Sequence, residues 1–194
     1  MADYSFFSIW ELRAPIDDVW KEISQSTSYA EWFPHVAESK LISMGDETGV
    51  GAITSTRWTS ALPYSLVFTT RTDRVERPHL IELTSTGDLE GTGRWDLSAN
   101  GDVTAVRYDW NVRTTKQWMD LIAPLARPAF GWNHAVIMRA GGEGLAARLG
   151  AELVRNQSFT EESANPLVPI SATAGLLALL ILGANMLRRA LSRS

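Results

Sequence analysis

Few residues in this chain have types and positions that suggest chemistry. His134, in the sequence GWNHAV, falls on the apolar stripe of a predicted helix. A general base there would need a partner and a substrate within hydrogen-bond reach, so a neutral core histidine is the simpler interpretation. Arg57 and Arg71 lie in strand-like runs, from which one of them could reach the headgroup of a ligand. The alternative is that both arginines face water on the outer side of a sheet.

Other signatures of catalysis or metal binding are missing from the sequence. There is no cysteine, which excludes disulfides, Cys-ligated zinc and thiol nucleophiles. No serine stands in a nucleophile elbow, and no two histidines have the spacing of a metal site. The glycine-rich sequence GDLEGTG lies between two strand-like runs, so it predicts a turn rather than a phosphate-binding loop. We therefore expect no catalytic constellation, no metal and no cofactor.

Aromatic side chains are the more informative group. The chain has 8 tryptophans in 194 residues. Core packing explains any one of them, but the set predicts a large aromatic-lined pocket, because aromatic rings bury much area and tryptophan and tyrosine keep a polar group. The predicted ligand-binding residues are Trp58, Tyr64, Phe68, Trp95, Tyr108, Trp110, Trp118, Phe130, His134, Ile137 and Gly141.

The elements that would position these residues begin with a strand and two short helices. The N-terminal sequence MADYSFFSIWEL alternates like a strand and lacks the basic and apolar regions of a secretory signal. Ile16, Val19, Trp20 and Ile23 have the spacing of one apolar helix face. A second short helix is predicted in SYAEWFPHV, ending before Pro34.

Residues 36–115 show a period of two, interrupted by turn signals that separate five or six strand-like runs. The clearest run is TAVRYDWNVRTT, in which apolar and aromatic side chains alternate with polar ones. Such alternation is typical of an antiparallel sheet with one face in water and one covered. The Asn100-Gly101 pair just before it predicts a hairpin.

A helical region is predicted from Lys116 to about Val154, with interruptions at Pro124 and Pro128. Its sequence RAGGEGLAA is unusual, because each glycine in a helix costs about 1 kcal/mol relative to alanine. The glycines either allow a hinge or a close helix–sheet contact, or leave space for a ligand between helix and sheet.

The order of elements resembles the helix-grip fold of the START, polyketide-cyclase and birch-allergen superfamily (SRPBCC). The resemblance covers roughly residues 4–150 and is carried by APIDDVWKEIS, YAEWFPHV, GVGAITSTRWTSALPYSL, TAVRYDWNV and the long helical region. It is most similar to the bacterial branch called polyketide cyclase/dehydrase and lipid transport. The resemblance implies an α+β fold, with an antiparallel sheet of six or seven strands wrapped around a long C-terminal helix. It also implies a deep apolar cavity for a lipid-like, isoprenoid or polyketide-like ligand.

The C-terminal part of the chain has a different character. No charged residue occurs from Ser163 to Leu187. As a helix, residues 167–187 would span about 31 Å, close to the ~30 Å of bilayer hydrocarbon. We therefore predict a ligand-binding domain at residues 1–154, a flexible linker at 155–166, a transmembrane helix at 167–187 and a basic tail at 188–194.

Charge bears on the partners of the chain and on its orientation in a membrane. The residues before the apolar segment contain 15 basic and 22 acidic side chains, a net charge of −7, which disfavours nucleic-acid binding. Three arginines follow the segment, and the positive-inside rule alone would place the C-terminus in the cytoplasm. Because no secretory signal is evident, we favour the other orientation, a single-pass tail-anchored protein with a cytoplasmic domain.

Three functions are compatible with these features. The first is membrane-tethered binding or transfer of a hydrophobic small molecule, favoured by the apolar tail and the lack of a catalytic constellation. The second is a cyclase or dehydratase acting on a polyketide-like or steroid-like substrate, with His134, Tyr108 or Arg57 as acid, base or oxyanion partner. The third is a protein-interaction module whose pocket is vestigial.

Overall fold

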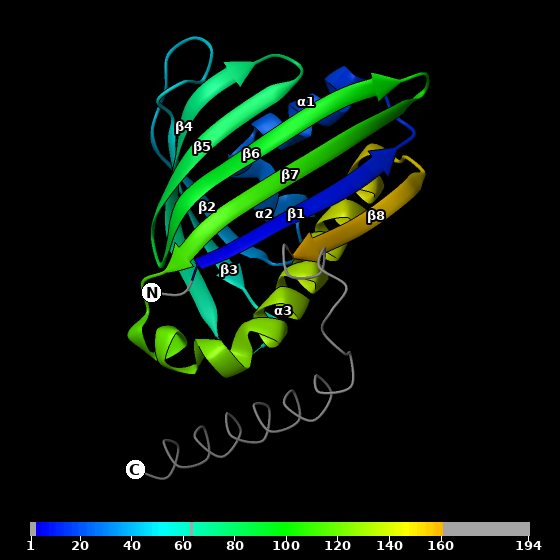
Figure 1. Cartoon of the computed structure of the whole chain (residues 1–194). Coiled ribbons are helices and arrows are strands. Elements are labelled where there is room, and N and C mark those ends of the chain that lie inside the picture. Colours follow the sequence, from blue (N-terminus) through cyan, green and yellow to red (C-terminus); the bar gives the residue numbers. More distant parts are fainter. Residues whose placement is uncertain (1–2, 63, 161–194) are drawn as a thin grey trace.

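The computed structural model describes residues 3–62 and 64–160, apart from the side chains of residues 117–127 (Figure 1). It is an α+β structure in which one antiparallel sheet curves around a long helix. In chain order the elements are β1 (Asp3–Leu12), α1 (Ile16–Ser24), the 3-10 helix η1 (Ser26–Ser28), α2 (Tyr29–Trp32), β2 (Val36–Ser43), β3 (Ile53–Thr59), β4 (Ser65–Glu76), β5 (Leu80–Gly87), β6 (Leu89–Asn100), β7 (Val103–Thr114), α3 (Gln117–Leu149) and β8 (Leu153–Thr160).

The eight strands lie in the order β2-β3-β4-β5-β6-β7-β1-β8. Strands β2 to β7 follow one another as hairpins, and β1 then pairs antiparallel with both β7 and β8. The alternation predicted in β7 is confirmed, since Val106, Trp110 and Val112 are buried while Arg107 is exposed. The predicted Asn100-Gly101 turn joins β6 to β7, with Gly101 in the left-handed region at φ 63°.

The prediction of six or seven strands is wrong by one edge strand. β8 contains residues 155–160, which were predicted to belong to a flexible linker. It pairs with β1, and Figure 1 shows it at the edge of the sheet beside the C-terminal half of α3. Polar groups make several of its contacts: Asn156 donates to the carbonyl oxygen of Arg139 at 2.8 Å, and the hydroxyls of Ser158 and Ser8 lie 2.8 Å apart. Phe159 also stacks on Phe7, with ring centroids 4.7 Å apart. The folded domain therefore extends to Thr160.

The predicted interruptions of the long helix at Pro124 and Pro128 are also wrong. The backbone of α3 is helical without a break from Gln117 to Leu149, and the helix ends where Gly150 adopts a left-handed conformation at φ 61°. Tertiary packing can hold a helix together across a proline at the cost of a backbone hydrogen bond. α3 is thus one helical element, but Figure 1 shows that it changes direction: its N-terminal part runs across the lower end of the sheet, and its C-terminal part runs up toward β8.

The glycines of α3 allow close packing, against the sheet as predicted at Gly142, where a Cβ would lie 3.0 Å from the Trp10 ring of β1, and also against α2, which was not predicted. A Cβ atom on Gly141 would lie 2.3 Å from Cζ of Phe33, and one on Gly144 would lie 1.9 Å from the carbonyl oxygen of Trp32. Both neighbours belong to the segment at the end of α2. The glycines therefore let α2 and α3 approach, and the ring of Phe33 occupies the space beside Gly141.

The main hydrophobic core lies at one end of the fold. It joins α1 and α2 to the C-terminal half of α3 and to the sheet, with Trp10, Ile23, Phe33 and Leu145 almost fully buried. The predicted apolar face of α1 is confirmed, because Val19, Trp20 and Ile23 are buried in it. Toward the N-terminal half of α3 the buried residues form smaller, separate clusters. Residues from all three clusters line the cavity described below.

The predicted membrane segment at residues 167–187, the basic tail at 188–194 and the remaining linker residues 161–166 lie outside the described residues. Within the part of the chain that the structure describes, no helix has the length and apolar character needed to cross a membrane.

Candidate ligand-binding cavity

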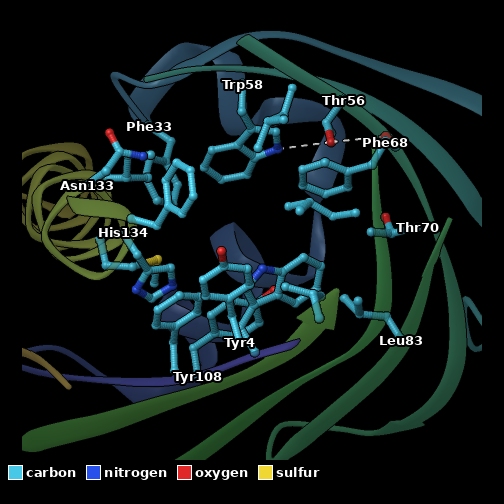
Figure 2. Close-up of a pocket in the computed structure, with 18 of the residues that line it drawn as sticks. Tyr4, Phe33, Thr56, Trp58, Phe68, Thr70, Leu83, Tyr108, Asn133 and His134 are labelled. Carbon is cyan, nitrogen blue, oxygen red and sulfur yellow. Dashed lines mark hydrogen bonds between the residues drawn. The ribbon is translucent and has the colours of Figure 1, made fainter. Parts of the chain in front are cut away.

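A cavity of about 150 Å³ lies between α3 and the covered face of the sheet. Figure 2 shows Trp58 and Phe68 on one side of the central space and Tyr108 on the other. The residues that line it are Tyr4, Phe6, Ser26, Tyr29, Phe33, Thr56, Trp58, Tyr64, Leu66, Phe68, Thr70, Leu83, Leu89, Trp95, Tyr108, Trp110, Val112, Thr114, Phe130, Asn133, His134, Ile137 and Met138.

Most of the predicted ligand-binding residues meet at this cavity, although their contact with a ligand stays a prediction. Those in the lining are Trp58, Tyr64, Phe68, Trp95, Tyr108, Trp110, Phe130, His134 and Ile137. Gly141 is not in the lining, because the ring of Phe33 fills the place beside it. The side chain of Trp118 lies outside the described part of the structure.

Six aromatic side chains of the lining form what we call the aromatic belt: Phe33, Trp58, Phe68, Trp110, Tyr108 and Trp95. Successive ring centroids in this order lie 4.9, 6.1, 5.7, 5.7 and 3.9 Å apart. Trp10, outside the lining, closes the circuit from Trp95 at 5.6 Å to Phe33 at 6.2 Å. All of these separations except the shorter Tyr108–Trp95 distance fall within the roughly 4.5–7 Å range of favourable aromatic pairs, so the rings of the belt pack against one another.

Several lining residues were missed by sequence reasoning. Phe6 of β1 and Phe33 after α2 reach the cavity, although they are remote from the strand region in which the pocket was expected. Phe6 could have been found, because it has the same parity as the buried Ser8 and Trp10 on an alternating strand. Phe33 follows a four-residue helix, and no periodicity in so short an element indicates its direction.

Asn133 of α3 ties the β3–β4 connection to the helix beside the cavity. Its Oδ1 accepts hydrogen bonds from the Ser60 hydroxyl at 2.7 Å and from the Ala61 N–H at 3.0 Å, while its Nδ2 donates to the Tyr64 hydroxyl at 3.3 Å. Burial raises the pKa of Tyr64, so its hydroxyl stays protonated at neutral pH. Asn133 is itself buried, and the hydrogen bonds of its side-chain amide stabilise the β3–β4 connection against α3.

His134 lines the cavity from α3, and one nitrogen of its imidazole ring has no hydrogen-bond partner among the described residues. Its ring stacks on Phe6 at a centroid distance of 4.2 Å and an interplanar angle of 10°. Its Nε2 is buried and makes no hydrogen bond within the described residues. Burial lowers the pKa of His134 to about 3, so the ring is neutral at physiological pH. The prediction of a neutral histidine is consistent with this environment, but its imidazole retains unused hydrogen-bonding capacity.

The tyrosines of the lining differ in how their hydroxyls are used. Tyr29 donates to the carbonyl oxygen of Ile23 at 2.6 Å. Tyr108 stacks on Trp95, and within the described residues no hydrogen bond to its hydroxyl is formed. Burial raises the pKa of Tyr108 well above its ordinary value, which keeps the phenol protonated. Its hydroxyl can therefore both donate and accept a hydrogen bond.

Charged side chains stay away from the cavity. No Asp, Glu, Lys or Arg is among the described residues of the lining. Arg57 pairs with Glu38 at 3.8 Å and Arg71 with Asp73 at 2.8 Å, both on the exposed side of the sheet. The role of Arg57 as an oxyanion partner is therefore wrong, and the outer-face interpretation is confirmed for both arginines. Within the described residues, no three His, Asp or Glu side chains are grouped as a metal site would require.

Together, the curved antiparallel sheet, the long helix and the aromatic-lined space between them define a helix-grip protein with an apolar cavity. Residues 10–150 match the family described as polyketide cyclase / dehydrase and lipid transport, and the chain belongs to this family. The resemblance noted in the sequence is therefore confirmed at the level of the superfamily. Among curated proteins, no sequence matches this chain significantly.

Solved structures share the fold at low sequence identity. The aromatase/cyclase Zhui from Streptomyces sp. R1128 is 15% identical, with a TM-score of 0.64 over 77% of this chain and 94% of its own. A START superfamily protein from Mycobacterium smegmatis is also 15% identical, with a TM-score of 0.63 over 76% of this chain and 97% of its own. BexL, a di-domain ARO/CYC of the BE-7585A biosynthetic pathway, is 19% identical with a TM-score of 0.62; the match covers 77% of this chain and 51% of BexL.

Proposed function

We propose that this protein binds a hydrophobic small molecule in its internal cavity and holds or transfers it at a membrane. The observation that supports binding is the cavity itself, which is lined largely by aromatic side chains and has no acidic or basic side chain in its described lining. Burying apolar ligand surface there contributes about 25 cal/mol per Å². Packed cores leave few voids larger than a water molecule, so a space of about 150 Å³ in a buried aromatic wall favours a ligand site.

The test compares two phenylalanine substitutions on β4. Thr70 lines the cavity, while the side chain of its neighbour Thr69 points to the other face of the sheet. We expect a hydrophobic compound to co-purify with the full-length wild-type chain and with Thr69→Phe, as detected by native mass spectrometry and organic extraction. Thr70→Phe should lose the compound, because the added ring occupies the cavity.

Two results would count against binding. One is a wild-type protein that is consistently empty when purified from membranes and that also takes up no added hydrophobic compound. The other is equal ligand content in Thr70→Phe and Thr69→Phe, since that would place the ligand outside the cavity. Circular dichroism on both variants separates loss of ligand from loss of fold.

The membrane part of the proposal is supported by residues 167–187, whose composition and length suit a bilayer span. A tether would keep the cavity close to ligands dissolved in the bilayer and raise their effective concentration. We place the ligand-binding domain on the cytoplasmic side. Resistance of the chain to carbonate extraction, together with digestion of the domain by protease added to inverted but not to right-side-out vesicles, tests both statements.

Catalysis is the second candidate, supported by one observation: His134 and Tyr108 both line the cavity. A cyclase or dehydratase would use them as acid and base on a polyketide-like or steroid-like substrate. The low pKa of His134 makes it a weak base at neutral pH, which favours binding over catalysis. If the protein were an enzyme, His134→Phe would abolish conversion of the co-purifying compound and leave its binding intact.

A further inference from the structure

The size of the cavity restricts what can fill it. Pockets for drug-sized ligands have volumes of roughly 300–1,000 Å³, and apolar cavities of about 150 Å³ hold one benzene-sized molecule. The present cavity, at about 150 Å³, is in the second group. A long acyl chain or a skeleton of several fused rings has several times the volume of benzene. To lie wholly inside the cavity, such a ligand would require the belt rings to separate, and their contacts with one another would be lost.

The electrostatics of the cavity restrict the ligand further. A carboxylate or phosphate in this space would find no arginine or lysine among the described residues of the lining. Its burial without a cation would carry a large desolvation penalty. An ammonium group would likewise lack a carboxylate, although aromatic faces attract cations. The ligand that fits the lining is electrically neutral.

We infer that the cavity takes a compact, neutral hydroxy-aromatic molecule of one ring, a simple phenol, rather than a long-chain lipid or a multi-ring polyketide. This inference rests on the proposed binding function and names the chemical class of its ligand. The aromatic belt offers ring faces and edges on opposite sides of the space, which suits offset or edge-to-face contacts with a flat ring (Figure 2).

The hydroxyl of the ligand has partners in Tyr108 and His134. Three other polar groups of the lining are already engaged: Tyr29 bonds to Ile23, Asn133 to the β3–β4 connection, and the Trp58 N–H to the Thr56 hydroxyl at 3.0 Å. The Tyr108 hydroxyl and the His134 imidazole retain capacity to donate and to accept. A single ligand hydroxyl can satisfy one or both of these groups and so remove the cost of leaving a buried polar atom without a partner.

The test uses matched ligands on the full-length chain in lipid nanodiscs, with empty nanodiscs as the calorimetric blank. The ligands are p-cresol, the isosteric hydrocarbon p-xylene, the anion 4-methylbenzoate and the neutral long-chain alcohol 1-hexadecanol. We expect p-cresol and p-xylene to bind in competition with each other. 4-Methylbenzoate should not bind, and 1-hexadecanol should not displace p-cresol.

The hydroxyl contact is tested by the ratio of p-cresol affinity to p-xylene affinity. In Tyr108→Phe and in His134→Phe, this ratio should fall about 2- to 10-fold in at least one variant, the effect of one lost hydrogen bond. Tyr29→Phe is the control, because it makes the same change at a lining tyrosine whose hydroxyl is already bonded within the protein. In that variant the ratio should equal that of the wild type.

The outcomes separate this inference from the proposed function. Displacement of p-cresol by 1-hexadecanol, or binding of the alcohol alone, would refute the phenol class and leave hydrophobic-ligand binding standing. An unchanged affinity ratio in both Tyr108→Phe and His134→Phe would refute the hydroxyl contact. If none of the four compounds bound to a folded wild-type chain, both proposals would be wrong.

Discussion

The environment of His134 makes a quantitative prediction about pH and stability. The imidazole lies on Phe6 with its Nε2 buried and without a partner in the described structure, so protonation in the folded state would bury an uncompensated charge. Replacing His134 with phenylalanine keeps an aromatic ring of similar size against Phe6 and removes the group that can be protonated. We expect His134→Phe to be at least as stable as the wild type at pH 7.5, since replacing a buried unpaired polar group with an apolar one is nearly neutral or stabilising.

The sign and size of the effect of pH on the unfolding free energy follow from the lowered pKa of His134. The folded-state pKa of about 3 is below the unfolded value of 6.5, so below pH 6.5 the unfolded chain binds a proton that the folded chain does not. The contribution of His134 to stability is therefore fully present above pH 6.5 and is lost as the pH falls toward 3. Between pH 7.5 and pH 4.5 the wild type should lose about 2–3 kcal/mol of unfolding free energy through this residue, at 1.36 kcal/mol per pKa unit.

The measurement is urea unfolding of the two full-length chains in identical nanodiscs, followed by tryptophan fluorescence at several pH values. Because all other titrating groups are common to both proteins, the difference between their unfolding free energies isolates His134. We expect this difference to shift by about 2–3 kcal/mol in favour of His134→Phe at pH 4.5. Parallel pH profiles would refute the reasoning. They would mean that the histidine has a polar partner in solution or is hydrated, so that its pKa is not lowered.

Sequence periodicity was sufficient to predict the fold class and the direction of most side chains in the sheet. β7 is the clearest case, because its apolar and charged residues alternate along 12 residues and leave only one register in which the apolar set is covered. The same alternation put Trp110 and Tyr108 on the covered face, where both line the cavity. Prediction succeeded wherever one face of an element was clearly apolar.

The edge strand β8 could not be recognised in this way. Its contacts to neighbouring elements include Asn156 to a carbonyl of α3 and Ser158 to Ser8 of β1, so its sequence reads as polar and turn-like. What makes it a strand is pairing with β1, a segment more than 140 residues earlier in the chain. The hydrophobic periodicity of a short segment does not indicate a pairing partner so distant in the sequence.

The cavity shows a second limit of sequence reasoning. Gly141 lies on the same helix stripe as Phe130 and Ile137, so the periodicity correctly placed it on the inner side of α3. The space next to it is filled by Phe33, which arrives from a separate helix. The volume of the cavity depends on how side chains from different elements pack, and shifts of about one ångström change it. For this reason an aromatic pocket could be predicted, but a pocket as small as one ring could not.

Two further predictions concern the elements around the cavity. Gly144→Ala should destabilise the domain by about 1–3 kcal/mol in urea unfolding, because the added methyl would lie 1.9 Å from the Trp32 carbonyl oxygen and overpacking outweighs the gain in helix propensity. The control is Glu143→Ala, at the exposed neighbouring position. Equal stability of the two variants would show that α2 and α3 are not packed this closely. Asn133→Ala removes the acceptor of the Ala61 N–H, a bond of 3.0 Å. The substitution also removes the bonds to the Ser60 and Tyr64 hydroxyls. The Ala61 bond alone corresponds to about 0.5–1.5 kcal/mol, so hydrogen exchange at Ala61 should become at least about 2- to 10-fold faster, while amides in the C-terminal half of α3 keep their rates. Uniform acceleration along the chain would instead indicate global destabilisation, and unchanged exchange at Ala61 would show that the β3–β4 connection is held over the cavity by other contacts.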